Sequence, residues 1–144
     1  MIALGDIEAR IAALRDAPAD TAAARVRAAE SLLALGEAVL EHWVAAQGGT
    51  PTDARREGFR LLALHRQGAR GVPSFNACRE TCRELVYHHN LVALDADHPE
   101  AGRRLRLAAM VAMHLYLFVS GKMEVDGIGE FCCSSKPLHA QTAP

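Results

Sequence analysis

Apolar residues recur every three or four positions through most of the chain, the spacing that gathers them on one face of an α-helix. Segments rich in Pro, Gly, Asp and Thr interrupt this pattern and divide it into separate units. The pattern predicts five helices, over residues 6–15, 21–46, 53–67, 74–94 and 99–119. The sequence therefore predicts an all-α protein.

Short polar residues stand where the first, second and fourth helices should begin: Asp6, Asp20 and Ser74. Side-chain oxygens of such residues accept hydrogen bonds from the free backbone N–H groups of a first helical turn. Gly48 and Pro51 follow the second helix, where glycine adopts a left-handed conformation easily and proline cannot continue a helix. We expect these residues to mark the helix boundaries.

The middle of the last predicted helix, LAAMVAMHLYLFV, is apolar on every side, which is typical of a helix enclosed by others. We therefore expect 99–119 to be the central helix of an up-and-down four-helix bundle, with 6–15 as a short extra N-terminal helix. The whole chain, 1–144, is predicted to form one helical domain. Because 121–144 contains three glycines and two prolines, we expect an irregular, cysteine-containing tail over 120–144, frayed after about residue 139.

Two cysteines lie one helical turn apart in the fourth predicted helix, Cys78 and Cys82. At about 100° per residue they are about 40° apart around the helix axis, and His89 projects between them. Apolar residues share this stripe, so we expect both thiols to face the core or a cleft.

Three further groups are predicted to approach this pair. The connection at 95–98 is short, so helices 74–94 and 99–119 should pack as an antiparallel hairpin, which brings His114 to the level of the two cysteines. Cys132 and Cys133 follow about a dozen residues after the hairpin and can fold back to the same end. His139 can follow them. The prediction is a site built from three segments of the chain.

Three chemistries would use such a site. Cys78, Cys82, Cys132 and Cys133, with His114 as an optional fifth group and His89 and His139 as secondary candidates, could bind Zn²⁺ or an iron–sulfur cluster. Soft thiolates would also suit Cu(I). Alternatively, a thiolate stabilised by the helix dipole and Arg79 could form a redox-active pair. Nucleophilic catalysis is the weakest hypothesis, because no acidic orienting residue or oxyanion turn is visible, and a non-enzymatic role is favoured.

The alternative is a helical interaction or regulatory module, either a homodimer or a binder of another protein, whose cysteines only pack the core. Free cysteine is among the most buried residue types and packs like a small apolar residue. An exposed apolar strip around Val39 and Trp43 on the second helix would favour this hypothesis.

Charge and composition narrow the remaining classes. A net charge of −1 and the absence of a helix-turn-helix pattern argue against nucleic-acid binding. The longest apolar run, 107–119, is too short to span a bilayer, so no membrane association is predicted. The first residues lack the basic and apolar regions of a signal peptide, and we therefore expect a cytoplasmic location.

Overall fold

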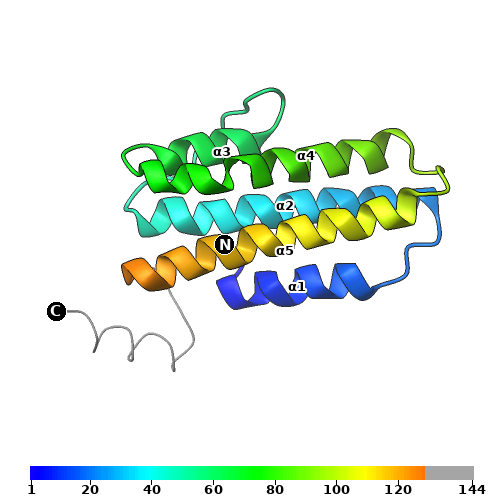
Figure 1. The fold of residues 1–144 in the computed structure, drawn as a ribbon, viewed down its shortest axis with the longest axis horizontal. Coiled ribbons are helices and arrows are strands. Elements are labelled where there is room, and N and C mark those ends of the chain that lie inside the picture. Colours follow the sequence, from blue (N-terminus) through cyan, green and yellow to red (C-terminus); the bar gives the residue numbers. More distant parts are fainter. Residues whose placement is uncertain (129–144) are drawn as a thin grey trace.

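The computed structural model describes residues 1–128, and positions 129–144 lie outside the described part. Five α-helices pack together, as the sequence predicts, and a 3₁₀-helix labelled η1 precedes the fourth (Figure 1). In chain order they are α1 (Leu4–Asp16), α2 (Ala22–Ala46), α3 (Arg60–Ala69), η1 (Pro73–Cys78), α4 (Arg79–Leu94) and α5 (Ala101–Asp126).

The long helices lie side by side along the long axis of the molecule (Figure 1). Helices α2, α4 and α5 all contact one another, α1 packs against α2 and α5, and α3 packs against α2 and α4. Their buried faces form one apolar core, which includes Leu32, Leu40, Leu61, Leu85 and Leu115. Among residues 1–128, no helix has the length and apolarity that a membrane span needs.

The bounds of the first two helices agree with the sequence pattern to within about two residues, but their predicted caps do not. The N-cap of α2 is Thr21, whose side-chain oxygen accepts a hydrogen bond from the Ala24 N–H at 3.1 Å. Asp20 stands one residue too early for this contact, and Asp6 lies inside the first turn of α1. Gly48, which follows α2, has the expected left-handed conformation with φ of +84°.

The third helix is shorter than predicted because 53–59 is not helical. Arg56 and Phe59 exchange two backbone hydrogen bonds of 3.0 Å around a tight turn. Its two central residues, Glu57 and Gly58, have φ of +54° and +85°, values that suit a two-residue hairpin turn. Arg60 then begins α3, with its guanidinium 3.3 Å from a carboxylate oxygen of Glu41 on α2.

Two boundaries of the fourth and fifth helices were wrong in the prediction. Ser74 lies within η1 and does not cap α4, which begins only at Arg79. Helix α5 continues through Gly121, which had been placed in the irregular tail, and ends at Gly127. There φ is +68°, and the Ile128 N–H donates to the Met123 carbonyl at 2.9 Å, which closes the last turn. Buried Met123 anchors this extension to the core.

The exposed surface also differs from the prediction. Val39 and Trp43 of α2 are fully buried, so they form no exposed strip. Helix α5 is not enclosed on every side, since Met110 and Leu117 are 59% and 57% exposed. Because the middle of α5 is apolar on every side, its sequence does not indicate which side faces the solvent.

Candidate functional site

The two cysteines of the fourth helix segment form a buried thiol pair at the junction of η1 and α4. Cys78 is the N-cap residue of α4, and Cys82 lies one turn further along. Their exposed fractions are 1% and 0%, and neither forms a disulfide. The expectation that both face the interior is confirmed.

A histidine from α3 completes the surroundings of Cys78. His65 is buried, and its Nε2 lies 3.1 Å from the backbone carbonyl oxygen of Phe75. In its protonated form the Cys78 thiol donates to the same oxygen at 3.2 Å. Because a carbonyl only accepts hydrogen bonds, the hydrogen in the histidine contact is on Nε2. Thiol and imidazole thus meet at one carbonyl group.

Aromatic rings hold this carbonyl in place. The Phe75 ring stacks on Trp43, with centroids 4.4 Å apart and planes 7° apart, and on His65, with centroids 5.4 Å apart. Trp43 Nε1 donates to the Gly68 carbonyl at 2.9 Å, which ties α2 to the end of α3. A Cβ at Gly68 would lie 2.7 Å from the Trp43 ring, so only glycine allows this approach. The cluster is held from α2, α3 and η1 together.

The end of α5 closes the cluster on its outer side. Lys122 Nζ donates to the Ser74 hydroxyl of η1 at 2.8 Å and lies 5.8 Å from the centre of the Trp43 ring. A cation over an aromatic face is attracted by the ring electrons. Helix α5 therefore ends beside η1.

Hydrogen bonding makes the two thiols electrostatically unequal. The hydrogen bond that the Cys82 thiol donates lowers the pKa of Cys78 to about 6, and His65 acts in the same direction through a hydrogen bond and its charge. Burial opposes both effects. The pKa of Cys82 is raised because its proton is held by Cys78 and its thiol is buried. The pKa values of the two thiols are therefore shifted in opposite directions.

The other predicted site residues do not join this cluster within the described chain. His114 is exposed on α5, whereas Cys78 and Cys82 are buried, and its predicted approach to the cysteines stays a prediction. His89 lies two turns beyond Cys82, about 10 Å along the helix. Its ring meets the edge of Phe59, and its Nδ1 is 3.0 Å from Asn90 Oδ1.

The remaining candidates, Cys132, Cys133 and His139, lie outside the described residues. Within 1–128, no group of three or more His, Cys, Asp or Glu side chains is placed to bind a metal ion. The shared metal site therefore stays a prediction that depends on the tail.

His65 was not predicted as a member of the site. Its position was visible in the pattern, since it stands four residues after Leu61 and three before Gly68, both buried on the same face of α3. A histidine on an apolar face is a weak signal by itself. What identifies it is the contact with Phe75, which only the packing of η1 against α3 creates.

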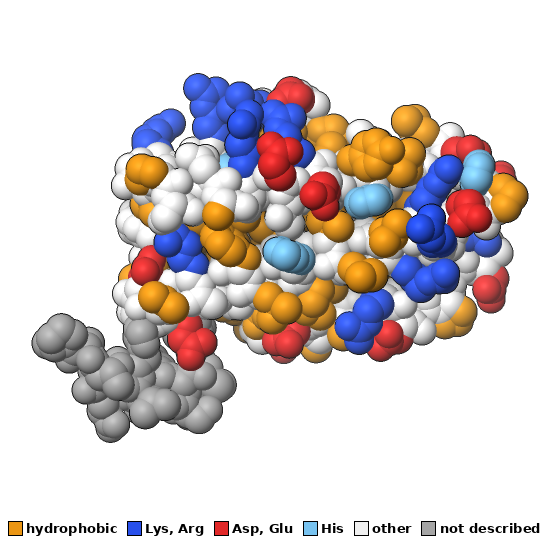
Figure 2. Space-filling view, viewed as in Figure 1, with side chains coloured by type: hydrophobic (Ala, Val, Ile, Leu, Met, Phe, Trp, Pro, Cys, Tyr) orange, Lys and Arg blue, Asp and Glu red, His pale blue; other side chains and the backbone are white. Residues whose placement is uncertain are grey.

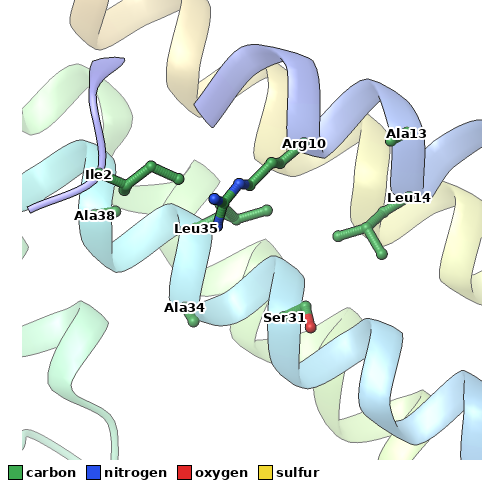
Figure 3. A pocket seen from close by; sticks show the side chains of 8 residues that line it. All are labelled: Ile2, Arg10, Ala13, Leu14, Ser31, Ala34, Leu35 and Ala38. Carbon is green, nitrogen blue, oxygen red and sulfur yellow. The ribbon is translucent and has the colours of Figure 1, made fainter. Parts of the chain in front are cut away.

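A second feature lies away from the cysteines, between α1 and α2 (Figure 3). It is an open hollow of about 480 Å³. Arg10 reaches across it from α1 toward Leu35 on α2 (Figure 3). The hollow is otherwise lined by Ile2, Ala13, Leu14, Ser31, Ala34 and Ala38. These lining groups include no thiol, imidazole or carboxylate, so the hollow offers no second centre for thiol or metal chemistry.

Comparison with known proteins gives no relative from which to transfer a function: no family model matches the chain, and no match was found among curated proteins or solved structures.

Proposed function

We propose that the protein is a thiol-based redox protein in which Cys78 is the attacking thiolate and Cys82 the resolving thiol. The observation that carries this proposal is the buried pair itself: Cys78 and Cys82 lie one turn apart with exposed fractions of 1% and 0%, and the neighbouring Cys82 thiol, with His65, lowers the pKa of Cys78 to about 6. A thiolate near neutral pH is the reactive form of cysteine.

The proposed reaction is exchange with a disulfide substrate. The Cys78 thiolate attacks one sulfur of the substrate, the substrate S–S bond breaks, and the first half leaves as a thiolate. A mixed disulfide on Cys78 results. Cys82 then loses its proton to the solution, its sulfur attacks that of Cys78, and the second half leaves as a thiolate. The substrate is reduced to two thiols, and the protein dithiol is oxidised to a Cys78–Cys82 disulfide.

The position of the pair suits the second step. Residues one turn apart on a helix have Cβ atoms about 5 to 6 Å apart, slightly more than the roughly 3.5 to 4.5 Å of a disulfide. The pair straddles the change from 3₁₀- to α-helix at Arg79, where the backbone is not locked into one regular ladder. A small adjustment at this junction would bring the sulfurs into bonding distance.

The first step requires movement, because both sulfurs are covered. Cys78 is the last residue of η1, and η1 is fastened from outside by the hydrogen bond between Lys122 and Ser74. We expect a substrate to reach Cys78 when η1 swings away. Reactivity would then depend on how firmly η1 is held.

A buried cysteine that only fills a core has a raised thiol pKa, unlike Cys78. Burial in apolar surroundings raises the pKa of a thiol, as it does at Cys82. At Cys78 the hydrogen bond from Cys82 and the contact with His65 outweigh burial. Packing alone requires neither polar contact, and this difference favours a chemical role.

The larger architecture and the metal site remain proposals beside this one. The mutual contacts of α2, α4 and α5, with α1 packed against α2 and α5, support a four-helix bundle in which α3, and not the N-terminal helix, is the short extra helix. Zinc or iron–sulfur binding by Cys78 and Cys82 would need Cys132 and Cys133 as further ligands. Metal analysis of the full chain beside Cys132→Ser/Cys133→Ser tests it: metal in the first and not in the second supports a shared site, and metal in neither removes it.

The redox proposal is tested by the pH dependence of thiol labelling in the Cys132→Ser/Cys133→Ser background, where only the helix pair can react. Labelling of Cys78 by iodoacetamide, followed by peptide mass spectrometry, should have its midpoint near pH 6. Cys82→Ala should move the midpoint upward because it removes the hydrogen-bond donor. Lys122→Met, which keeps the apolar stem and frees Ser74, should increase the rate with the midpoint unchanged.

Incubation with glutathione disulfide then tests the reaction itself. We expect a Cys78–Cys82 disulfide in the parent protein and a stable mixed disulfide on Cys78 in the Cys82→Ala variant. If Cys78 labels only above pH 8, or if neither product forms while the fold is intact, the cysteines are packing residues.

A further inference from the structure

The exposed side of α5 carries an apolar centre between charged ends. The stripe, which we call the α5 stripe, repeats at alternating intervals of four and three residues: Arg103, Leu107, Met110, His114, Leu117, Gly121 and Glu124. Such spacing is the heptad pattern by which two helices pack along a common seam. The opposite side of α5 is already buried in the core.

The composition of the α5 stripe is unusual for a solvent-facing surface. Met110 and Leu117 at its centre are 59% and 57% exposed. Exposure of large apolar side chains to water is unfavourable, since their burial would stabilise the protein. His114 lies between them and is also exposed. Figure 2 shows hydrophobic and histidine side chains over α4 and the middle of α5 on the face viewed. Grouped exposure of this kind marks interaction surfaces.

The two ends of the α5 stripe have opposite charge. Three arginines lie near the start of α5, at 103, 104 and 106, and arginines gather at that end in Figure 2. Exposed Glu124 lies near its end, and Asp126 after it is 4.0 Å from Lys122 Nζ. Lys122, the one cation in the last turns, is directed toward Ser74 of η1. The helix is thus basic at its start and acidic on the exposed side of its end.

We propose that the α5 stripe binds the α5 stripe of a second copy of this chain, antiparallel, with the two-fold axis at His114. Residues whose numbers sum to 227 or 228 then face each other. Arg103 lies opposite Glu124 of the second copy, and Leu107 lies opposite its Gly121. Met110 lies opposite Leu117, and the two His114 side chains meet at the axis.

Apart from the two His114 side chains at the axis, this self-pairing places chemically compatible residues opposite each other. Each apolar residue meets an apolar residue or a glycine, and each charged residue meets its opposite, twice in the dimer because the interface is isologous. A parallel pair would instead place Arg103 beside Arg103 and Glu124 beside Glu124, which repel. The charge order therefore selects a second copy in the antiparallel orientation as the partner.

The length of the α5 stripe sets the strength of association. The 21 residue steps from Arg103 to Glu124 span about 32 Å of helix. A seam of this length that is only one helix wide buries less area than the roughly 800 Å² per partner of a stable interface. We therefore expect a reversible dimer with a dissociation constant on the order of ten micromolar.

The test is sedimentation velocity under reducing conditions, over protein concentrations that bracket about ten micromolar. Arg103→Glu and Glu124→Arg should each weaken the dimer by about tenfold or more, because each change places like charges opposite each other twice. The double variant Arg103→Glu/Glu124→Arg should return the dissociation constant to within about threefold of the parent. Leu117→Gln should weaken the dimer in both low and high salt, because its contribution is apolar.

Arg70→Glu is the matched control, since Arg70 is exposed but lies just after α3, off the α5 stripe. It should leave the dimer unchanged, and circular dichroism should show the same helix content in all variants. A parent protein that is monomeric throughout the range overturns the proposal. So does a double variant as weak as the single ones.

Discussion

Helix α2 contacts its neighbours in two very different ways. Toward α3 and η1 it presents Trp43, which stacks on Phe75 and donates to the Gly68 carbonyl. Toward α1 it presents mainly small residues, among them Ala34 and Ala38, and a hollow of about 480 Å³ remains between the helices. We refer to these two contacts as the aromatic cluster and the α1–α2 seam.

The difference shows that the aromatic cluster, and not the α1–α2 seam, buries the larger side chains and fixes the positions of its neighbours. Aromatic rings bury large areas and prefer particular geometries, so Trp43 and Phe75 constrain several segments at once. Alanine buries little area and constrains nothing beyond close approach. The buried thiol pair lies against the rigid region, as a reactive site requires, because its polar groups must be held in place by their surroundings.

The largest effect should come from removing the centre of the aromatic cluster. Phe75→Ala should lower the free energy of unfolding by about 3 to 5 kcal/mol, because it leaves a cavity between Trp43 and His65. Leu14→Ala in the α1–α2 seam should cost about 1 kcal/mol, since Leu14 is only half-buried and borders an open hollow. Urea unfolding of both variants measures the difference, and equal losses would contradict the comparison.

The second prediction concerns pH. Between about pH 6 and 8.5 an unfolded chain keeps the Cys78 proton that the native protein has lost, so stability should rise with pH. From pH 6 to 8 the rise should be about 2 to 3 kcal/mol. Above the ordinary thiol pKa the native protein retains the Cys82 proton that the unfolded chain loses, and stability should fall again.

Denaturant unfolding at several pH values, compared between the parent protein and Cys78→Ser, separates this effect from the titration of histidines. The serine variant should lose most of the rise. A rise of the same size in both proteins would assign the pH dependence to other groups.

A pair of glycine substitutions should change stability in opposite directions. Gly68→Ala should destabilise by about 1 to 3 kcal/mol, because its Cβ would lie 2.7 Å from the Trp43 ring and 3.1 Å from the Phe75 ring. Gly5→Ala in α1 meets no atom within 4 Å and should stabilise by up to about 1 kcal/mol through helix propensity. Thermal unfolding would reveal the contrast, and a neutral Gly68→Ala would show that the aromatic cluster can yield.

The smallest effect should come from filling the α1–α2 seam. Ala34→Leu adds apolar area beside Leu14 and Leu35 without displacing a packed group, so we expect stabilisation of less than about 1 kcal/mol. Differential scanning calorimetry is sensitive enough to detect it. A marked loss of stability would mean that the hollow has no room for the leucine side chain.

Much of the helical layout could be predicted because it depends on local regularities. The spacing of apolar residues located α1 and α2 to within about two residues, and the faces of Cys78 and Cys82 followed from the same period. The turn at Glu57 and Gly58 was missed because the helix was started directly after Thr52, although its apolar residues begin only at Phe59. The passage of α5 through Gly121 was missed because its cause, burial of Met123, lies in the tertiary packing.

The site could be predicted only in part. Two thiols on one face of a helix follow from the number of residues between them. His114 was assigned to the same site because the hairpin sets its height, but height along a helix does not determine direction around it. His65 was passed over because nothing in the local pattern joins it to residues ten or more positions away.

The sequence alone thus determined the helical class and the burial of Cys78 and Cys82, because both follow from apolar residues that recur every three or four positions. The tertiary structure decided which groups surround the pair: packing of η1 against α3 places His65 and Cys78 at one carbonyl, and contact with α1, α2 and α4 leaves a single side of α5 exposed. Those choices depend on how side chains from distant segments fill a common volume, which local periodicity does not encode.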